Sequence, residues 1–589
     1  MKLNMILSAS GWRKVFAESG NEQDSTASIT NDDYNIAITA ADTFLEYLIN
    51  KTEQDTPVIA IGMDTRPTGP KIADAMVRIL LAKNAVIQYL GVTAAPEIMA
   101  YAKKLDGFIY ISASHNPIGH NGIKFGLNDG GVLNAQENAI LTEEFKKRIA
   151  NEDYLASIKY LTDNCSTSKV REIESEFKSS KHNALKAYHE FMNETITGEK
   201  DVNRQNQFFS TLLQANTEKP VGIVCDFNGS ARTVSIDREY FAQHKINFYT
   251  INDKPGQIVH EIIPEAENLV YVAQEMEKLH HEGHDEVILG YMPDCDGDRG
   301  NIVYWDETAK KAVILKAQEV FSLSVLAELS YSIWQNRDNK DFRPAVAVNC
   351  PTSMRIEEIA HALGAEVFRA EVGEANVVNL AREKREQGYT VRILGEGSNG
   401  GTITYPSSVR DPLNTIFALV KLLSMKNDGL FELWCKALRI PYNRDFTLND
   451  IIKTLPVYTT TGVSEPCAIL HIKNTDHADL KRKFQKHFEE EWNEKKDFLK
   501  KEYNIYSYEA VITNGTKETC GITDYSLSKK GGLKIVFKDQ NFNPVAFMWM
   551  RGSGTEPVFR IMCDVKGDCR FLERMLIEWE TSLLQKADK

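Results

Sequence analysis

Residues 57–64, PVIAIGMD, form a short apolar run with the length and β-branched content of a buried strand. Residues 71–85, KIADAMVRILLAKNA, carry apolar side chains at helical spacing, and VIQYLG (86–91) and GFIYIS (107–112) predict two further strands. Strands and a helix that alternate in this order are typical of βαβ units. This stretch therefore predicts an α/β protein.

The same alternation begins again at three later points of the chain. They are VGIVCDFNGS (221–230), AVAVNCPTS (345–353) with the helical RIEEIAHALGAEVFRA after it, and AILHIKN (468–474) before a charged helix. A chain of 589 residues is well above the length at which one hydrophobic core stops growing. We therefore expect four α/β units, and the polar run 163–182 resembles a surface excursion or the approach to a long helix at a domain boundary.

Net charge and cysteine content restrict the classes of partner and compartment. The formal net charge of −13 argues against a nucleic-acid partner, because phosphate backbones are bound mainly by clustered Lys and Arg. The nine cysteines are odd in number and form no CxxC pair, so neither a disulfide framework nor a zinc knuckle fits them. No apolar run is long enough to span a bilayer, and MKLNMILSAS offers too short an apolar stretch for a secretory signal. We expect a cytoplasmic protein that binds neither nucleic acid nor membrane.

The first chemical motif, ISASHNP (111–117), places a serine at the end of a predicted strand. The Ser114 hydroxyl is a weak nucleophile until neighbours activate it or stabilise developing charge, and His115, Asn116 and Lys124 are close in sequence. A polar turn that caps a helix is the alternative, because Ser, Asn and Pro are common turn residues.

The second motif, PDCDGDRG (293–300), carries carboxylates at alternate positions, Asp294, Asp296 and Asp298. In extended backbone, alternate side chains share a face, so three hard oxygen ligands can converge on one divalent cation, and Mg²⁺ fits best. A solvated acidic turn is the alternative, although three carboxylates so close together repel unless a cation neutralises them. The motif predicts a magnesium site.

The third motif is LGEGSNGG (394–401), which follows the predicted strand VRIL. Its glycines let the backbone approach a ligand closely, while Glu396 and Ser398 present an acceptor and a donor suited to sugar hydroxyls. A simple glycine turn is the alternative.

The fourth motif is RGSGTEPVFR (551–560), in which glycines flank a hydroxyl residue. Backbone N–H groups of such a loop form an anion nest, and Arg551, Ser553 and Thr555 add a guanidinium and two hydroxyls. This is good chemistry for a phosphate monoester, and a tight turn is the alternative. A nucleophile, a metal site, a polyol binder and a phosphate binder together make a complete phosphosugar enzyme.

These four motifs, in this order, resemble those of the α-D-phosphohexomutase superfamily over essentially the whole chain. The N-terminal SASGWR also resembles a family element, and it places Arg13 near the phosphoserine. The resemblance implies an α/β, four-domain architecture with three similar mixed α/β domains and a C-terminal α+β domain around a central cleft. The expected domains are 1–186 with the phosphoserine loop, 187–313 with the metal loop, 314–462 with the sugar loop and 463–589 with the phosphate loop.

The resemblance also implies a role for each motif residue. Ser114 is expected to be the phosphorylated nucleophile and a metal ligand. Residues of the metal and phosphoryl site are expected to be Asp294, Asp296, Asp298, Arg13, His115, Lys124 and Arg299. Residues that hold the substrate are expected to be Glu396, Ser398, Asn399, Arg551, Ser553, Gly554 and Thr555. Mg²⁺ is the expected cofactor, hexose 1,6-bisphosphate the expected activator, and hexose phosphates are the expected partners.

The chain departs from the family pattern at two positions. Cys295 stands in the metal loop where a small residue is commoner, and we expect it to be packed in the interior. Gly400 stands where some members carry a histidine, which leaves the proton acceptor open. Lys124 is our first candidate, with a pKa lowered by neighbouring cations, and His115 and His120 are its rivals. Arg66, in the segment IGMDTRPTG, is interpreted as a turn residue.

The expected reaction interconverts hexose 1-phosphate and hexose 6-phosphate through the phosphoserine and a hexose 1,6-bisphosphate, with glucose first and mannose next as the sugar. A hexose-bisphosphate synthase or phosphopentomutase of the same fold is an alternative. A catalytically silent sugar-phosphate-binding protein is another, from a different class. An aspartyl-phosphate hydrolase that uses Asp294 is disfavoured, because its motif wants Thr or Val where Asp298 stands. The sequence leaves the oligomeric state open.

Overall fold

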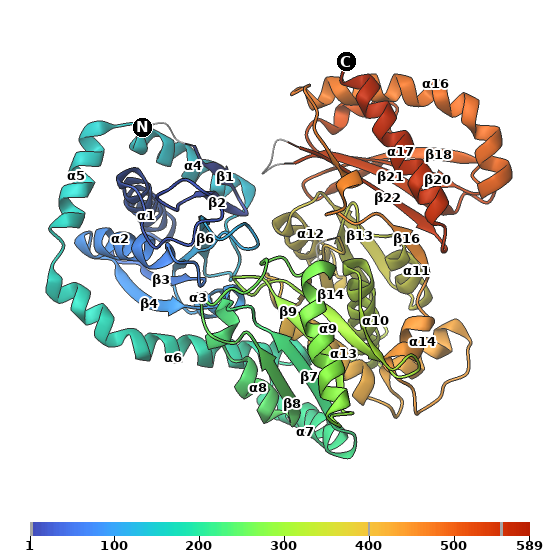
Figure 1. Cartoon of the computed structure of the whole chain (residues 1–589), viewed down its shortest axis with the longest axis horizontal. Helices are drawn as coiled ribbons and strands as arrows, with labels where there is room; N and C mark the ends of the chain where they lie inside the picture. Colours follow the sequence, from blue (N-terminus) through green and yellow to red (C-terminus); the bar gives the residue numbers. More distant parts are fainter. Residues whose placement is uncertain (1–3, 399–400, 554–557) are drawn as a thin grey trace. The chain divides into compact units, whose positions relative to one another are not determined.

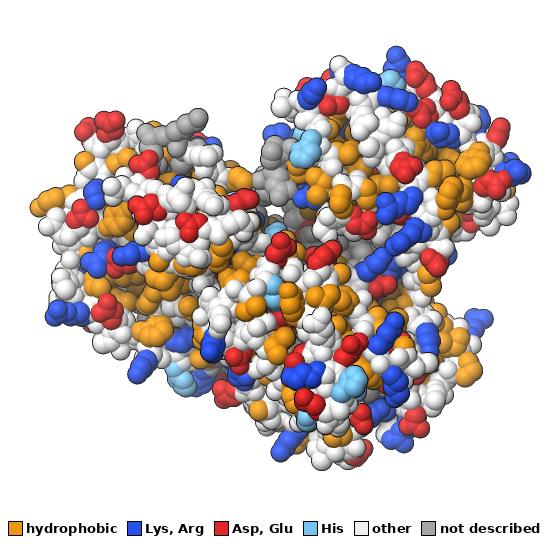
Figure 2. All heavy atoms as spheres, viewed as in Figure 1, with side chains coloured by type: hydrophobic (Ala, Val, Ile, Leu, Met, Phe, Trp, Pro, Cys, Tyr) orange, Lys and Arg blue, Asp and Glu red, His pale blue; other side chains and the backbone are white. Residues whose placement is uncertain are grey.

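The computed structural model describes residues 4–398, 401–553 and 558–589 (Figure 1). The chain forms two compact units, Met1–Lys316 with Ile403–Met425, and Ala317–Thr402 with Lys426–Lys589. Lys and Arg side chains are interspersed with Asp and Glu on the face shown in Figure 2. Within the described residues, every helix is too short or too polar to cross a bilayer.

The first sheet has six strands in the order β1-β2-β6-β5-β3-β4. Its strands are β1 (Ile6–Ser8), β2 (Gly11–Val15), β3 (Val58–Met63), β4 (Val86–Val92), β5 (Gly107–Ile111) and β6 (His120–Leu127). Helices of this part are α1 (Asn31–Thr52), α2 (Gly69–Ala82), α3 (Ala95–Ala102) and α4 (Ala135–Ile149). Parallel pairing of β3 with β4 and β5 confirms the βαβ prediction, and antiparallel β6 makes the sheet mixed.

Three helices lead from the first sheet to the second. They are α5 (Glu152–Asp163), α6 (Thr167–Thr197) and α7 (Val202–Glu218). Most of the polar run 163–182 is therefore helical, and α6 passes without a break through position 186, where one predicted domain ends. Ala184, Ala187 and Tyr188 of α6 are buried, which explains how so polar a helix is held.

The second sheet has the order β11-β10-β9-β7-β8. Its strands are β7 (Val221–Asp226), β8 (Ile246–Ile251), β9 (Val287–Pro293), β10 (Gly300–Asp306) and β11 (Lys311–Ile314). Helices α8 (Asp237–Gln243), α9 (Ala266–His281) and α13 (Pro412–Ser424) belong to the same unit. β7 is parallel to β8 and β9, whereas β10 is antiparallel to β9, so the metal motif is the connection between antiparallel neighbours.

The third sheet, in the second compact unit, has the order β13-β12-β14-β15. Its strands are β12 (Pro344–Asn349), β13 (Glu366–Ala370), β14 (Thr390–Gly395) and β15 (Thr402–Thr404). The helices in this part of the chain are α10 (Ala317–Gln335), α11 (Arg355–Ala362), α12 (Glu374–Glu386), α14 (Leu430–Leu438) and α15 (Leu448–Lys453). β12 is parallel to β13 and β14, as βαβ connections require.

The fourth sheet is antiparallel, with the order β16-β22-β21-β20-β18-β19 and β17 paired to β22. Its strands are β16 (Tyr458–Thr460), β17 (Ile469–Leu470), β18 (Ser507–Asn514), β19 (Lys517–Cys520), β20 (Gly532–Lys538), β21 (Pro544–Gly552) and β22 (Phe559–Lys566). Helices α16 (His477–Tyr503) and α17 (Arg570–Ala587) pack on each other, and α17 packs on β21 and β22 (Figure 1). Three mixed α/β sheets and a C-terminal antiparallel one confirm the predicted fold class. The three boundaries between the four predicted domains stay predictions.

Candidate active site

The serine motif forms a tight loop between β5 and β6. Ser114 has a left-handed backbone conformation, φ 54°, and is almost fully buried. Its amide donates to the Ser112 hydroxyl at 2.8 Å, and its own Oγ donates to Asp294 Oδ2 at 2.7 Å. The strained conformation thus aims the hydroxyl at the carboxylates of the metal motif.

A buried arginine holds this loop. The Arg66 guanidinium, 1% exposed, pairs with Asp64 at 3.1 Å. Its Nη2 donates to the carbonyls of Ser114 and Asn116 at 2.7 and 2.6 Å, and Nη1 donates to that of Pro117 at 2.6 Å. Arg66 does lie in a turn, as interpreted, because its carbonyl accepts from the Gly69 amide at 3.0 Å, but no sequence motif predicted this second role. The only available signal was the i, i+2 spacing of Asp64 and Arg66.

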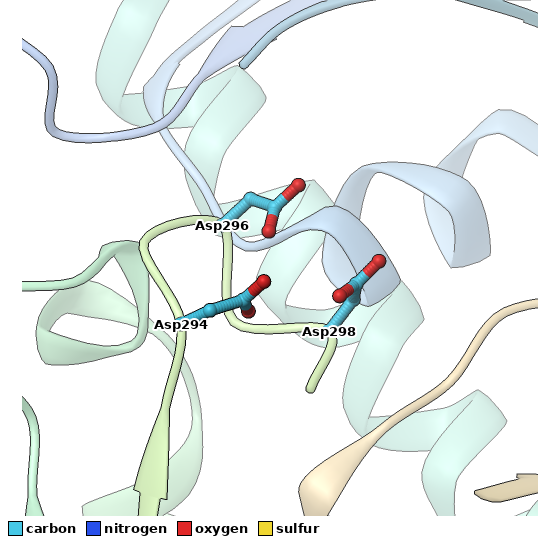
Figure 3. A group of neighbouring side chains, drawn as sticks. All are labelled: Asp294, Asp296 and Asp298. Carbon is cyan, nitrogen blue, oxygen red and sulfur yellow. The ribbon is translucent and has the colours of Figure 1, made fainter. Parts of the chain in front are cut away.

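The metal motif gathers three buried carboxylates. Each of Asp294, Asp296 and Asp298 offers one oxygen, and these oxygens all lie within 4.8 Å of one another (Figure 3). Burial, together with the charges of its two neighbours, holds the pKa of Asp294 well above its usual range. Three hard carboxylate oxygens that converge in this way fit a divalent cation.

The route to this convergence differs from the prediction. The loop is a turn rather than extended backbone, because the Gly297 amide donates to the Asp294 carbonyl at 3.1 Å. Gly297 has φ 72°, and a Cβ on it would approach Arg232 Cγ to 2.4 Å. Turn geometry, not strand alternation, therefore brings the aspartates together.

Two cations and a second buried arginine fix the metal loop. Lys124 donates to Asp296 at 2.7 Å, and Arg410 donates to Asp298 at 3.0 Å. Arg232, fully buried with Asp237 as its ion-pair partner at 2.8 Å, donates Nη1 to the Gly297 carbonyl at 3.2 Å. Sequence reasoning identified Lys124 but missed both arginines, because neither belongs to a predicted motif.

Lys124 has a charge state opposite to the predicted one. Burial alone would lower the pKa of Lys124, but Asp296 and Asp298 outweigh burial and raise it. The expected lowering is therefore wrong. Its physical reason is the direct ion pair with Asp296, a carboxylate that lies 172 positions away in the chain. Lys124 acts here as a fixed cation.

His115 lies beside the nucleophile, with Nδ1 3.4 Å from Ser114 Oγ. The charge of Arg299, then burial and the charge of Arg13, hold the pKa of His115 well below its usual range. The ring is therefore held neutral, and the same cations make it a weak proton acceptor. His120 instead has its Nε2 3.4 Å from Glu22. The catalytic roles of these residues stay predictions.

Cys295 is buried in the metal loop. Its Sγ lies 3.5 Å from Thr65 Oγ1, and burial raises the pKa of the thiol far above its ordinary value. A neutral, buried thiol at this distance is a packing group, which confirms the interpretation of Cys295.

The sugar motif presents its carboxylate at the end of β14. Glu396 Oε1 accepts from Asn349 Nδ2 at 2.9 Å and from the Gly373 amide at 2.8 Å. The Ser398 hydroxyl lies 3.5 Å from the same Asn349 nitrogen. These contacts orient Glu396 within the second unit. Asn399, a further predicted ligand, lies outside the described residues.

The phosphate motif begins at the end of β21. Arg551 Nε lies 3.1 Å from Glu371 Oε1, and the Ser553 amide donates to the Val558 carbonyl at 2.8 Å. The Arg551 side chain is one quarter exposed. Gly554 and Thr555, which we predicted as ligands, lie outside the described residues.

Comparison with known proteins agrees with this architecture. The family model for Phosphoglucomutase/phosphomannomutase, alpha/beta/alpha domain I matches residues 9–152, and the model for domain III matches residues 324–438. Residues 9–152 and 324–438 thus match two domains of the phosphoglucomutase/phosphomannomutase (α-D-phosphohexomutase) superfamily. Within this superfamily, a Thermococcus kodakarensis phosphoglucomutase/phosphomannomutase is 24% identical over 547 residues, 92% of this chain and 93% of the relative.

Other phosphohexomutase relatives match over shorter parts. A Methanococcus vannielii phosphoglucosamine mutase is 25% identical over 319 residues, 54% of this chain and 60% of the relative.

Among solved structures, the phosphoglucomutase pp63/parafusin of Paramecium has a TM-score of 0.62 at 14% identity, and the match covers 99% of this chain and 95% of the Paramecium chain. A Burkholderia thailandensis family protein has a TM-score of 0.60 at 15% identity, with 99% and 97% covered. Both structures show the shared fold over the full length.

Proposed function

We propose that this chain is a phosphohexomutase that uses Ser114 as its phosphorylated nucleophile. One observation carries the proposal: Ser114 Oγ is held 2.7 Å from Asp294, inside a group of three buried carboxylates. A serine aimed at a metal site suits phosphoryl transfer, which depends mainly on positioning and electrostatics.

The donor set fits Mg²⁺. It consists only of hard oxygens, which lie within 4.8 Å of one another, and burial with the like charges of its neighbours raises the pKa of Asp294. Asp294, Asp296 and Asp298, with an oxygen on Ser114, would hold the ion. When bound, the ion neutralises charge on the transferring phosphoryl group.

The reaction we propose begins with phosphorylated Ser114. Its phosphoryl group passes to the free hydroxyl of a hexose monophosphate, the P–O bond to Ser114 breaks, and a hexose 1,6-bisphosphate forms. Lys124 and Arg299 offset charge on the transferring group. The bisphosphate then reverses its orientation in the site and returns its other phosphate to Ser114. A hexose 1,6-bisphosphate therefore also serves as the activator that phosphorylates the free enzyme.

The second unit supplies the groups that hold the rest of the substrate. Glu396 and Ser398 suit sugar hydroxyls, and Arg551 and Ser553 suit the phosphate that is not reacting. Because this set binds hydroxyls and a phosphate in either orientation of the sugar, it supports a mutase. Hexose phosphates are therefore the proposed partners, with glucose first and mannose next as the sugar. Bisphosphate synthesis and phosphopentomutase activity are the alternatives that share this chemistry.

A coupled assay with glucose 1-phosphate or mannose 1-phosphate and a catalytic amount of hexose 1,6-bisphosphate tests the proposal. Ser114→Ala should lose turnover, whereas Ser168→Ala, at an exposed serine of α6, should keep it. Intact mass after incubation with the bisphosphate should show one added phosphoryl group, mapped to residues 111–117. Full activity in Ser114→Ala would exclude the assignment, and binding without turnover in the unaltered chain would favour the silent sugar-phosphate-binding protein.

A further inference from the structure

Glu371, which belongs to no predicted motif, touches the phosphate motif directly. It follows β13, is 5% exposed, and its Oε1 lies 3.1 Å from Arg551 Nε. The contact is an ion pair between the carboxylate and Nε of the guanidinium. An arginine held in this way presents a fork of fixed direction, which is the geometry that bidentate phosphate binding needs.

The fourth sheet contains a socket built for this carboxylate. Glu371 Oε2 accepts from the Thr513 hydroxyl at 3.0 Å and from the Gly532 amide. A Cβ at Gly531 would lie 2.9 Å from this oxygen, so the glycine pair makes room for it. The fully buried Lys481 donates through Nζ to the Gly531 carbonyl at 2.5 Å, and this contact fixes the backbone at the glycine pair. Glu371 therefore has a fixed position before any ligand binds.

The same short segment reaches the sugar motif. Two residues after Glu371, the Gly373 amide donates to Glu396 Oε1 at 2.8 Å. The Glu371 amide in turn donates to the Gly515 carbonyl at 2.8 Å. Residues 371–373 thus contact the phosphate-binding arginine at one end and the sugar-binding carboxylate at the other. A rigid link of this kind fixes the spacing between the two ligand-binding groups.

We infer that Glu371 is a positioning residue for Arg551, and that it sets the direction in which the guanidinium meets the distal phosphate of the substrate. The inference rests on the proposed function, since it takes Arg551 as a phosphate ligand. Without the Glu371 charge, the Arg551 side chain regains rotamer freedom, and the substrate must order it on binding.

Steady-state kinetics of the full chain with glucose 1-phosphate, and inhibition by inorganic phosphate as a probe of the loop, test the inference. Glu371→Gln should raise KM and the phosphate inhibition constant by roughly tenfold and leave kcat within a factor of about two, the pattern of lost uniform binding. Thr513→Val removes a contact of Oε2 but not the pair with Arg551, so it should keep KM. Glu366→Gln, at an exposed position on β13, the strand that Glu371 follows, is the matched control.

Combination with Arg551→Ala separates the two hypotheses. If Glu371 acts through Arg551, Glu371→Gln adds little to the KM of Arg551→Ala. A full additional effect, an unchanged or lowered KM in Glu371→Gln, or an equal rise in Thr513→Val would overturn the positioning role. An unchanged KM in Arg551→Ala itself would refute the phosphate-loop assignment, and the inference with it. If Glu371→Gln does not fold, Glu371→Asp keeps the charge but withdraws it from Arg551, and KM must again rise.

Discussion

Arg66→Met should lower both the stability and the activity of this protein. The guanidinium is fully buried and donates to carbonyls of the loop that carries Ser114. Its removal also leaves Asp64 buried without its partner, where burial already raises the pKa of that carboxyl and Arg66 opposes the rise. Breaking a buried pair in this way costs about 3–5 kcal/mol.

The first unit exceeds 300 residues, so its unfolding entropy is about 0.7 kcal/mol/K and a loss of this size should lower its melting temperature by roughly 4–7 °C. Activity should fall further than stability accounts for. A displacement of the nucleophile by about 1 Å can cost on the order of a hundredfold in rate. We therefore expect kcat of Arg66→Met to fall by roughly that factor at a temperature where the variant remains folded.

Arg78→Met is the matched control, because Arg78 pairs with Asp74 across one turn of α2 at 2.9 Å but is one third exposed. An exposed i, i+4 pair is worth only about 0.3–0.5 kcal/mol. Circular dichroism melts and kcat should be measured on both variants and on Arg66→Lys, which keeps the charge but not the fork. Equal melting temperatures in Arg66→Met and Arg78→Met, or a wild-type kcat in the former, would refute the clamp.

Three other predictions follow from charges in the structure. EDTA should abolish activity and Mg²⁺ should restore it. Mg²⁺ should also raise the melting temperature of the wild type but not that of Asp298→Asn. Activity in excess EDTA would contradict the metal site. Lys124→Met should lower kcat without flattening the basic limb of the pH profile of kcat, because Lys124 is the counter-ion of Asp296. A flattened limb would restore Lys124, rather than its rival His115, as the proton acceptor. Burial lowers the pKa of Lys481 from 10.5 to about 7. The unfolded chain therefore keeps this proton to higher pH than the folded chain does, and the free energy of unfolding should rise between pH 7 and 9 by up to roughly 1.4 kcal/mol per pH unit. Lys481→Met should remove that slope in pH-dependent melts, and an unchanged slope would show that Lys481 is not its source.

The sheets and the placement of the motifs could be predicted from the sequence because their signals are local. The apolar run that became β3 and the helical spacing in α2 fix their own secondary structure within a few residues. The serine, metal and sugar motifs each follow such a strand, and the structure places them after β5, β9 and β14. Short apolar strands and the polar residues that follow them are visible in one sequence without any knowledge of tertiary contacts.

The charge states and supports of the site could not be predicted, because they depend on residues far apart in the chain. Lys124 and Asp296 are 172 positions apart, and Arg410 and Asp298 are 112 apart. No periodic pattern marks a buried arginine, and composition favours an exposed one. The lowered pKa predicted for Lys124 failed for this reason, since it counted the cations near in sequence and not the carboxylate that the fold supplies.

Buried arginines support two described loops of this chain that follow a strand end. Arg66 donates to three carbonyls of the serine loop within 2.7 Å, and Arg369 donates through Nη1 to the carbonyls of Asn349, Cys350 and Thr352 at 2.7–3.1 Å. A loop that must expose a nucleophile or a ligand cannot pair its carbonyls in a sheet ladder, and each unpaired buried carbonyl costs about 1–3 kcal/mol. One guanidinium, with five donors in a rigid plane, satisfies several such carbonyls at once while it fixes their relative positions. Each arginine also has a carboxylate beside it, Asp64 or Glu357, which offsets the cost of burying the charge. The loops can therefore hold a strained serine or an ordered ligand group without the support of regular secondary structure.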